Sequence, residues 1–481
     1  MKIKKLFKDK VELFIFLISF FIALTFFLFQ TRIFSWDFSV YVMNGEYFLN
    51  KSDYFEWLRP PLVPFIFMIF RIFSRKFAIY SFIIFSTILY FFSLKLFHDK
   101  FLKNIKNSWS FYLFAINPYI LLRGLYIGTE LISLSFIILF VVFAFSAGSF
   151  IFLGLSMLTR YSNIILLPTI LLSKNIKKIL IALIIIFFVF LPWLLINYIF
   201  TGHALTSIGD YYALNSLEQA PPKFDLNLLF FHLVLTININ FPFLILGILN
   251  ISKILKNEKK LIITLILITF LTLFIYMITY LKQERFLFNL SLLIFYLSVH
   301  GFNFIEKIKK SNLIKIIIVI LLLIISLLSS FIILDKFTTH IVKEEKIIKE
   351  IINKVDNCTI VSDLWVYFNW YGKKAIPPVF GSSYKINSAV NEGYNIILFK
   401  NYEVFKKNKD EIEKLKDYII ENNENYIWIR NYENCKIDDK INKTYIEELK
   451  SLSEFPKDFS GCDALMLKLK LRKICKIFNF L

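Results

Sequence analysis

The sequence predicts a polytopic α-helical membrane protein with a C-terminal α/β domain. Of its 481 residues, 57% are hydrophobic and 19% are charged, whereas soluble domains carry about 45–50% apolar and about 25% charged residues. Long apolar runs, such as residues 180–200 and 316–334, approach or exceed the roughly 20 residues that cross a hydrocarbon core. From about residue 336, charged residues become frequent and the apolar runs shorten to the length of strands.

About eleven segments are apolar enough to be membrane spans. They lie approximately at residues 11–30, 76–97, 109–123, 129–146, 148–160, 161–173, 178–200, 228–252, 260–281, 285–304 and 316–334. We interpret the first as an uncleaved span, because it is long for a signal peptide and no small-residue cleavage site follows it. The two short segments between residues 148 and 173 can form a helical hairpin with its tip at Arg160.

The positions of the lysines predict the orientation of the chain. The lysine-rich segments are the N-terminus and residues 98–107, 173–178, 253–260 and 306–315, which the positive-inside rule places in the cytoplasm. An odd number of spans then makes residues 336–481 extracytoplasmic. Because the lysines occupy short loops rather than one face of a soluble domain, the net charge of +20 does not indicate a nucleic-acid partner.

Two long outer loops are expected. The loop from residue 30 to about 75 contains a helix-like stretch at 38–49 and an apolar stretch at 62–73, which begins with a proline pair. Proline suits the first turn of a helix, and the apolar stretch is too short to span, so we expect it to lie in the membrane interface. The loop at 201–227 is too polar to cross the membrane and too long to be a simple connector.

The C-terminal segment, residues 336–481, is long enough for a core of its own. Strand-length apolar runs lie at residues 359–361, 395–399, 426–429 and 465–469, and a charged segment of helical period lies at 403–422. This pattern predicts a small α/β domain after a transmembrane domain at 1–335.

All four cysteines, Cys358, Cys435, Cys462 and Cys475, lie in the C-terminal segment. Their spacing matches no zinc signature, and the scattered histidines His203, His232 and His300 make no ligand set, so we expect no metal. In an oxidising compartment, Cys435 and Cys462 could form a disulfide. In the alternative interpretation, the cysteines stay unpaired and buried.

The first outer loop contains the residues with the clearest chemical potential. Asp37 follows the first span almost directly, where a carboxylate can sit in a half-dry cleft and accept a proton from a hydroxyl group. Arg59 precedes Pro60 and Pro61, which restrict its backbone, and a guanidinium at the level of the lipid headgroups suits a phosphate. The alternatives are that Asp37 is an ordinary acidic residue at the membrane interface and that Arg59 only extends its guanidinium group to the level of the headgroups.

The order of these features resembles that of the protein O-mannosyltransferase and aminoarabinose-transferase group, which are GT-C-fold glycosyltransferases related to glycosyltransferase family 39. The resemblance rests on Asp37 after the first span and on the basic-Pro-Pro-Leu sequence at 59–62. It continues with Gly-Thr-Glu-Leu at 128–131, Leu-Thr-Arg-Tyr at 158–161 and Lys-Gln-Glu-Arg-Phe-Leu at 282–287. It covers most of residues 1–335. Each motif alone is weak, and it is their order along the chain that indicates the family.

The resemblance implies one-step, inverting transfer of a sugar from a polyprenyl-phosphate donor on the outer face, with Asp37 as the general base. The cations expected to bind the donor phosphate are Arg59, Arg123, Arg160, Lys282 and Arg285. The residues expected to bind or support the substrates are Tyr41, Glu56, Glu130, Tyr161 and Glu284. All five cations fall at the predicted outer ends of spans, where a phosphate leaving group requires positive charge, although some can instead anchor helix ends.

The sequence departs from the family pattern in two places. Phe38 follows Asp37, where many relatives have a second acidic residue, and Trp57-Leu58 stands before the proline motif in place of a closely spaced Glu-Lys pair. The first departure bears on how the acceptor is activated, and the second bears on the role of Glu56.

Two other functions use similar features. A transporter or flippase for a polyprenyl-linked glycan also needs many spans, but it should show paired repeats or charges at the membrane midplane, and we find neither in the sequence. A glycan polymerase or ligase would use the same carrier with a glycan acceptor. The expected partners are a polyprenyl-phosphate sugar, the lipid bilayer and a protein, lipid or glycan acceptor, with no cofactor.

Overall fold

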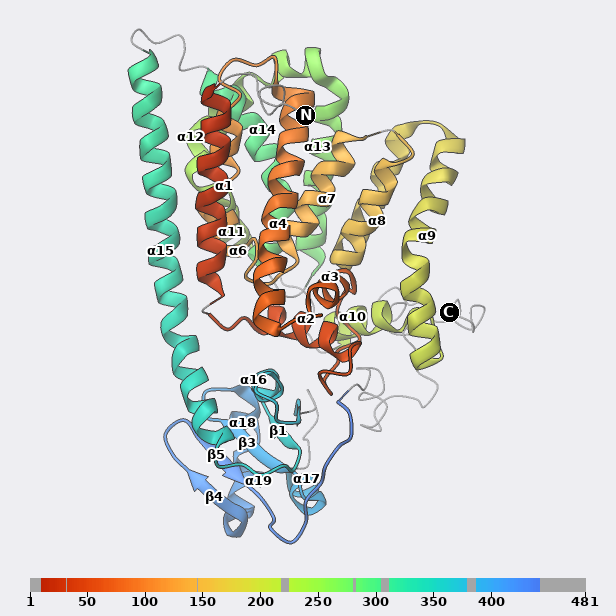
Figure 1. Ribbon diagram of the computed structural model, residues 1–481, viewed down its shortest axis with the longest axis vertical. Helices are drawn as coiled ribbons and strands as arrows, with labels where there is room; N and C mark the ends of the chain where they lie inside the picture. The colour runs from red at the N-terminus through yellow and green to blue at the C-terminus, as the bar shows by residue number, and fades with distance from the viewer. Residues whose placement is uncertain are drawn as a thin grey trace.

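A computed structural model describes residues 10–31, 33–144, 146–217, 225–279, 283–303, 311–378 and 386–441. A helical bundle forms one part of the molecule, and a small α/β domain lies below it along the long axis (Figure 1). The long helix α15 (Ser311–Ile352) connects them: residues 313–335 are apolar, and the helix continues without a break to Ile352.

The bundle and its loops contain eighteen of the described helical elements. These are α1 (Lys10–Gln30), α2 (Trp36–Tyr47), α3 (Leu62–Phe70), α4 (Arg75–Phe97), η2 (His98–Leu102), α5 (Ser110–Phe114), α6 (Pro118–Arg123), α7 (Glu130–Val142), α8 (Ser149–Thr159), η3 (Tyr161–Ser173), α9 (Ile176–Thr201), α10 (Thr206–Leu217), α11 (Leu226–Ile237), η4 (Asn238–Asn240), α12 (Phe241–Leu249), α13 (Ile251–Ile278), η5 (Glu284–Leu290) and α14 (Ser291–Phe302).

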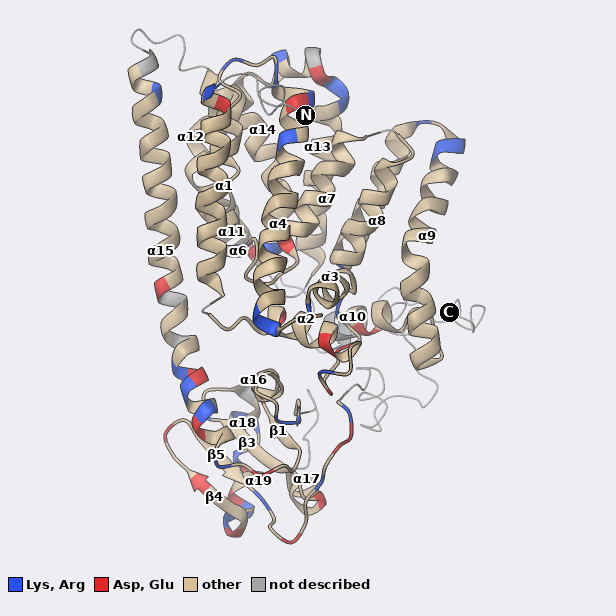
Figure 2. Ribbon diagram, viewed as in Figure 1, with Lys and Arg blue, Asp and Glu red and all other residues tan. Residues whose placement is uncertain are grey.

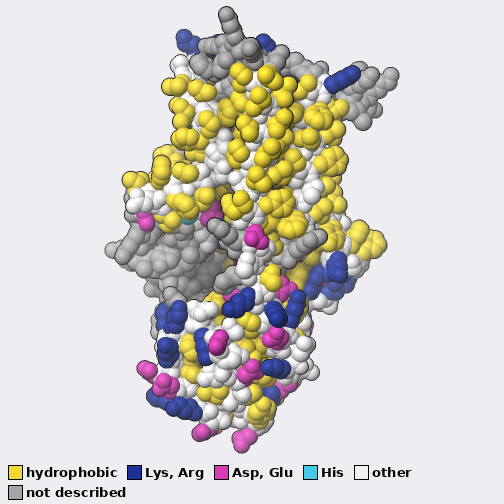
Figure 3. Space-filling view, turned by 90° about the vertical axis from the view of Figure 1, so that its left-hand side faces the viewer, with side chains coloured by type: hydrophobic (Ala, Val, Ile, Leu, Met, Phe, Trp, Pro, Cys, Tyr) yellow, Lys and Arg dark blue, Asp and Glu magenta, His cyan; other side chains and the backbone are white. Residues whose placement is uncertain are grey.

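The bundle is that of a multi-pass membrane protein. Within the described ranges, seven helices are long and apolar enough to cross a membrane, and three shorter apolar helices lie at Glu130–Val142, Ser149–Thr159 and Tyr161–Ser173. Hydrophobic side chains cover the bundle surface, whereas charged ones gather on the α/β domain and at the far end of the bundle (Figures 2 and 3).

The segment expected as a span at 109–123 is not one continuous helix. It consists of α5 and α6, and α6 has its own start: the Asn117 side chain accepts a hydrogen bond from the Ile120 N–H at 2.9 Å, and Pro118 follows. Proline without an N–H favours the first turn of a new helix over the interior of an old one.

Small residues allow two helices of the bundle to pack very closely. A Cβ atom built on Gly247 of α12 would lie 2.1 Å from the Leu297 carbonyl oxygen of α14, and one built on Gly301 would lie 1.9 Å from the Phe243 carbonyl oxygen. Close backbone contact of this kind replaces the hydrophobic effect as a packing force between helices in lipid.

The long loop after α1 folds as expected, into two short helices. Helix α2 covers most of the predicted stretch at 38–49, and α3 covers most of the stretch at 62–73. The second outer loop differs from expectation, because residues 206–217 form the helix α10. The sequence-based interpretation placed a loop here because the segment is polar and long.

The α/β domain is built on a five-stranded mixed sheet of order β2-β1-β3-β5-β4. Its elements are β1 (Ile360–Ser362), α16 (Trp365–Trp370), β2 (Ala375–Ile376), α17 (Ile386–Glu392), β3 (Asn395–Phe399), α18 (Glu403–Lys407), α19 (Lys409–Lys414), η7 (Lys416–Tyr418), β4 (Ile419–Asn422) and β5 (Tyr426–Ile429). β1 pairs in parallel with β2 and β3, whereas β5 runs antiparallel to β3 and β4.

The strands at 395–399 and 426–429 were predicted with their exact bounds, and β1 is shifted by one residue from the prediction. The charged segment at 403–422 is helical only in its first part, because residues 419–422 form β4 and pair with β5. The strand predicted at 465–469 lies outside the described residues.

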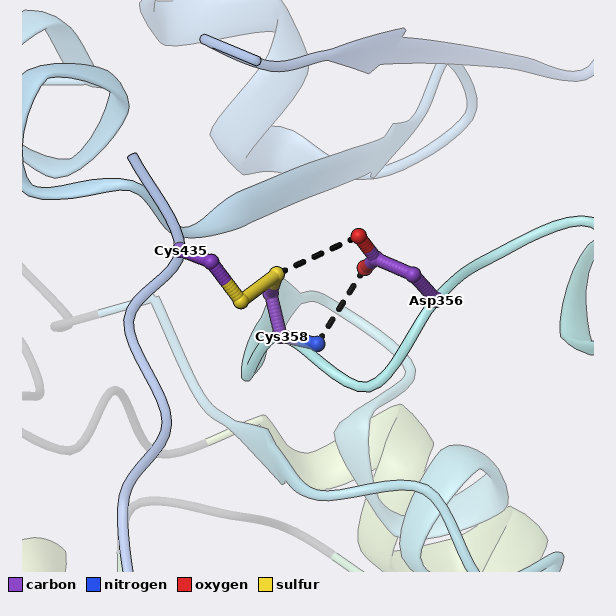
Figure 4. A group of neighbouring side chains, drawn as sticks. All are labelled: Asp356, Cys358 and Cys435. Atoms are coloured by element: carbon purple, nitrogen blue, oxygen red, sulfur yellow. Dashed lines mark hydrogen bonds between the residues drawn. A yellow bond between two sulfur atoms is a disulfide. The ribbon is translucent and has the colours of Figure 1, made fainter. Parts of the chain in front are cut away.

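The cysteine prediction requires correction. Cys435 pairs with Cys358, 77 residues earlier, rather than with Cys462, and the alternative of unpaired cysteines is likewise wrong for these two. The Asp356 carboxylate accepts a hydrogen bond from the Cys358 N–H at 3.1 Å beside the disulfide (Figure 4). Cys462 and Cys475 lie outside the described residues.

The α/β domain packs directly against the long loop between α1 and α4. Phe34 stacks on Tyr367 with ring centroids 3.7 Å apart, and Trp36 meets Trp365 edge-on at 4.6 Å. The chain near Ile441 also pairs with the loop, since the Phe55 N–H donates to the Ile441 carbonyl at 2.8 Å. The first residues of α2 are therefore held from both sides, by the bundle and by the domain.

Candidate functional site

Asp37 lies in the first turn of α2, directly after the chain leaves α1. Its side chain is 18% exposed, so it is largely removed from water at the boundary between the bundle and the α/β domain. The N-terminal end of a helix favours a negative charge, which suits the ionised form of this carboxylate.

Two arginines bind the Asp37 carboxylate, one on each oxygen. Arg59 Nη1 lies 2.6 Å from Oδ1, and Arg285 Nη1 lies 2.5 Å from Oδ2. Burial by itself raises the pKa of Asp37, but the two guanidinium groups outweigh it and hold that pKa well below its usual range. Residues from three distant motifs thus meet at one point.

The Arg59 side of the site is held by a chain of polar contacts that reaches the α/β domain. Arg59 Nε lies 2.8 Å from Glu56 Oε2, and Glu56 also accepts a hydrogen bond from the Tyr54 hydroxyl. The Tyr54 hydroxyl in turn accepts from Trp365 Nε1 of α16 at 2.8 Å. The buried Asn44 side chain makes two hydrogen bonds to the Glu56 backbone, at 2.9 and 3.0 Å, which fix this loop against α2.

The Arg285 side of the site contains two further arginine–carboxylate pairs. Arg123 Nε lies 2.7 Å from Glu284 Oε1. Arg160 Nη1 lies 3.4 Å from the buried Glu130 and donates to the Arg285 backbone carbonyl at 3.1 Å. The Nε atom of Arg285 is buried without a hydrogen-bond partner within the part of the chain that the structure describes.

The site is therefore a network of alternating charge. Its cations are Arg59, Arg123, Arg160 and Arg285, and its anions are Asp37, Glu56, Glu130 and Glu284. Four positive charges face four negative ones, so the network is neutral as it stands. An additional anion must displace a carboxylate or cause one to take up a proton.

Gly128 explains the place of the Gly-Thr-Glu-Leu motif in the site. Its φ of +91° favours glycine, and a Cβ atom at this position would lie only 2.7 Å from the ring of Phe38. Phe38, which occupies the position of the expected second acid, packs on Gly128 next to Asp37. Thr129 donates a hydrogen bond to Glu130 at 3.0 Å, which orients the carboxylate that Arg160 meets.

Aromatic residues surround the network. Tyr41 is buried, and the Arg59 guanidinium carbon lies 5.9 Å from the centre of its ring. Tyr161 contacts other aromatic residues: its hydroxyl accepts a hydrogen bond from Trp193 Nε1 at 2.8 Å, and its ring meets Tyr211 edge-on at 5.6 Å. The Tyr161 hydroxyl is thus bound to Trp193 rather than to a member of the charge network.

Tyr211 of α10 is a residue of the site that the sequence did not reveal. Burial raises the pKa of Tyr211, and the charges of Arg160, Arg285 and Arg59 oppose that rise, so its hydroxyl lies within electrostatic reach of all three arginines. The signal that would have found it is the helix α10 itself, which was interpreted as part of a long polar loop.

Glu46 was the nearest alternative base in the sequence, and the structure gives it another role. It is completely buried, and its carboxylate binds Arg71 Nε at 2.5 Å and Arg75 Nε at 2.9 Å. Nine residues of helix separate it from Asp37, a rise of about 13 Å. Glu46 therefore fastens α2 to the end of α3 and the start of α4.

The remaining candidates are distributed as follows. Lys282 lies outside the described residues. His232, one of the scattered histidines, has its Nε2 atom 3.9 Å from Glu284. Elsewhere, Glu12, His98 and Asp99 come close together, but Lys95 Nζ pairs with Asp99 and lies 3.5 Å from Glu12, so a lysine already supplies positive charge to that cluster.

Comparison with solved structures identifies the fold. The crystal structure of ArnT from Cupriavidus metallidurans bound to undecaprenyl phosphate matches with a TM-score of 0.56 and 8% sequence identity, over 87% of this chain and 97% of that chain. No protein-family model and no curated protein sequence matches the chain. The predicted GT-C-like fold, a helical membrane part followed by an α/β domain, is thereby confirmed.

Proposed function

We propose that this protein is a membrane glycosyltransferase that transfers a sugar from a polyprenyl-phosphate carrier to an acceptor hydroxyl group. The observation that carries the proposal is the Asp37 carboxylate held between the guanidinium groups of Arg59 and Arg285. This arrangement places a proton acceptor beside two phosphate-binding groups. It occurs in a fold shared with a protein whose crystal structure contains undecaprenyl phosphate.

The arginines suit the leaving group. As the bond between the anomeric carbon and the phosphate oxygen breaks, the carrier gains a negative charge, and preorganised guanidinium groups stabilise that charge most effectively in a site with little water. Arg59 and Arg285 are 16% and 22% exposed, and Arg160 contacts the Arg285 backbone. We therefore assign the binding of the donor phosphate to Arg59, Arg160 and Arg285. Arg123 and Lys282 are assigned a lesser share of this binding.

Asp37 is assigned as the general base. The acceptor oxygen forms a bond to the anomeric carbon on the face opposite the phosphate, its proton passes to Asp37, and polyprenyl phosphate leaves. The configuration at the anomeric carbon inverts, and no covalent sugar–enzyme intermediate forms.

Donor binding is needed to raise the pKa of Asp37 before it can act as a base. A carboxylate bound by two arginines, with a pKa well below its usual range, is a weak proton acceptor. A donor phosphate that takes over one or both guanidinium groups removes that stabilisation and raises the pKa of Asp37. Asp37 then becomes basic only when a donor is bound, which protects the site from unproductive proton transfer.

The orientation is part of the proposal. The α/β domain and helix α2, whose first turn contains Asp37, lie at the same end of the bundle (Figure 1), and the disulfide Cys358–Cys435 suits an oxidising compartment. Lysines and arginines mark the opposite end of the bundle (Figure 2), as expected for a cytoplasmic face. We therefore place the site on the outer face.

A transfer assay tests the proposal. Purified protein in lipid nanodiscs is given a panel of polyprenyl-phosphate hexoses and pentoses, and the release of polyprenyl phosphate is measured by mass spectrometry with and without extracted surface glycans and glycolipids. We expect release with at least one donor, dependent on an acceptor. Movement of the intact lipid-linked sugar across a vesicle membrane, with no bond cleavage, would instead support the transporter interpretation.

A further inference from the structure

A polar cavity lies at the end of the bundle remote from Asp37. It has a volume of about 550 Å³ and lies between η2 with its following loop, the start of α13 and the end of α14. Helix α4 separates the two ends: Arg75 at its start binds Glu46 of α2, and η2 follows its other end. A helix of this length rises about 34 Å, so the cavity lies at the opposite membrane boundary.

Three side chains on one face of α14 and its end line this cavity and have unpaired polar atoms. Tyr296 Oη, His300 Nε2 and Asn303 Oδ1 are each buried, with no hydrogen-bond partner in the described part of the chain. Their spacing of four and three residues places them on the same side of the helix. Unpaired buried polar atoms also occur elsewhere in the bundle, but these three belong to side chains that line one cavity, so a ligand bound there could supply the missing partners.

The charge of the cavity indicates the sign of that ligand. Lys100, Lys103 and Lys253 line it, and among the described lining residues Glu258 is the one carboxylate. Lys100 Nζ also donates to the Val142 carbonyl, which ties that side chain to the end of α7. Three positive charges and one negative charge favour an anion.

The walls of the cavity distinguish a lipid from a free ion. Phe101, Ile105 and Ile254 line it together with the polar groups, and the cavity lies where membrane-spanning helices end. A free phosphate gains nothing from apolar walls, whereas the glycerol and first methylenes of a phospholipid do. Basic pockets between the ends of spans are a known type of site for anionic headgroups.

We infer that this cavity binds the headgroup of an anionic phospholipid in the leaflet opposite the Asp37 site. The lysines, the Tyr296 hydroxyl and an Nε2-protonated His300 donate to the phosphate oxygens, while Asn303 Oδ1 accepts from a headgroup hydroxyl. A phosphate with an adjacent hydroxyl group, as in phosphatidylglycerol, satisfies all three unpaired atoms. This inference does not depend on the proposed enzymatic activity.

Thermal unfolding of the purified full-length protein in detergent tests the inference. The probes are phosphatidylglycerol, phosphatidylcholine and inorganic phosphate, each added over a concentration series. A ligand that binds only the folded state raises the unfolding temperature. We expect phosphatidylglycerol to raise it and the other two probes to have little effect.

Two variants remove ligand contacts, and one serves as a matched control. Tyr296→Phe and Lys253→Gln should each raise the half-stabilising concentration of phosphatidylglycerol about tenfold, the usual effect of losing a hydrogen bond or ion contact to a charged group. Tyr90→Phe removes a buried hydroxyl that already donates to the Ala115 carbonyl at 2.8 Å. It should lower the unfolding temperature under every condition and leave the lipid dependence unchanged.

Three results would overturn the inference. Equal stabilisation by phosphatidylcholine would remove the requirement for an anion, and equal stabilisation by inorganic phosphate would show a free-anion site instead of a lipid site. Wild-type lipid dependence in both Tyr296→Phe and Lys253→Gln would show that the lipid binds elsewhere.

Discussion

Asp37 and its two arginines depend on one another. Each carboxylate oxygen meets a separate guanidinium group, and every arginine in the network has a carboxylate partner. At the scale of single residues, the positive and negative charges of the site balance, so a phosphate can enter only by exchanging partners. In the proposed mechanism, this exchange couples donor binding to the basicity of Asp37.

Substitution of Arg59 tests the donor side of this exchange. Arg59→Ala should weaken use of the lipid donor by roughly tenfold or more, because a charge-assisted contact to the phosphate is lost. Arg59→Lys should lose less, since lysine keeps the charge and loses only the forked geometry. The measurement is the dependence of turnover on donor concentration.

Lys76→Ala serves as the control, because Lys76 is an exposed cation in the first turn of α4 at the same boundary. It should behave like the wild type. If both Arg59 variants keep full activity, Arg59 does not bind the donor.

Several residues of the site could be predicted from the sequence, and others could not. The motifs at 37, 59 and 285 identified three residues that the fold brings together. The sharing of Asp37 by Arg59 and Arg285 was not predictable, because it depends on a contact between residues 248 positions apart in the chain. Tyr211 was missed for the same reason: nothing in its local sequence shows which arginines it faces.

At the scale of elements, α2 is the platform of the site. Asp37 lies at its start, Asn44 holds the Arg59 loop, and Glu46 at its far end binds Arg71 and Arg75. The position of Asp37 therefore depends on how firmly α2 is fastened to α3 and α4.

Glu46→Gln should loosen this platform. The amide cannot neutralise two arginines, and breaking a buried ion pair costs about 3 kcal/mol or more. We expect the unfolding temperature to fall by several degrees and activity to fall with it. Differential scanning fluorimetry of Glu46→Gln beside the exposed control Glu413→Gln measures this. Equal unfolding temperatures in the two variants would show that Glu46 does not anchor α2.

Elements with strong local patterns were predictable, and those defined by distant partners were not. The strand at 395–399 is a short run of apolar residues, and the helix at 62–70 follows a proline pair. By contrast, β4 was assigned to a helix because its strand character comes from pairing with β5. Helix α10 was interpreted as a loop because the segment that contains it is polar and long.

At the scale of the whole molecule, the α/β domain closes over the loop that carries the site. Phe34, Trp36 and Tyr54 share a hydrophobic cluster with residues of the sheet and α16. The sequence predicted both parts and their order, but not this contact, since neither part shows in its own sequence which surface the other covers.

Cysteine labelling tests the orientation of the molecule. Native Cys358 is unsuitable as a probe, because it is buried and bound to Cys435. Glu413→Cys places a thiol on the exposed helix α19, in a background with Cys462 and Cys475 replaced by serine. A membrane-impermeant maleimide should label it on intact cells. Labelling only after the membrane is broken would place the α/β domain, and Asp37 with it, in the cytoplasm.

In the proposed mechanism, Asp37 takes the proton from the acceptor hydroxyl group after the donor phosphate has bound Arg59 and Arg285. Asp37→Asn keeps the size of the side chain but cannot accept that proton, and it frees two guanidinium groups for the donor. Asp37→Glu should keep partial activity if the site tolerates one extra methylene.

The most direct measurement combines turnover and donor binding of Asp37→Asn with a polyprenyl-phosphate sugar that the wild type uses. We predict that turnover falls by roughly 10²-fold or more, while donor affinity stays equal to that of the wild type or increases. Turnover equal to that of the wild type would place the base elsewhere. A collapse of donor binding would show that Asp37 organises the site rather than accepting a proton.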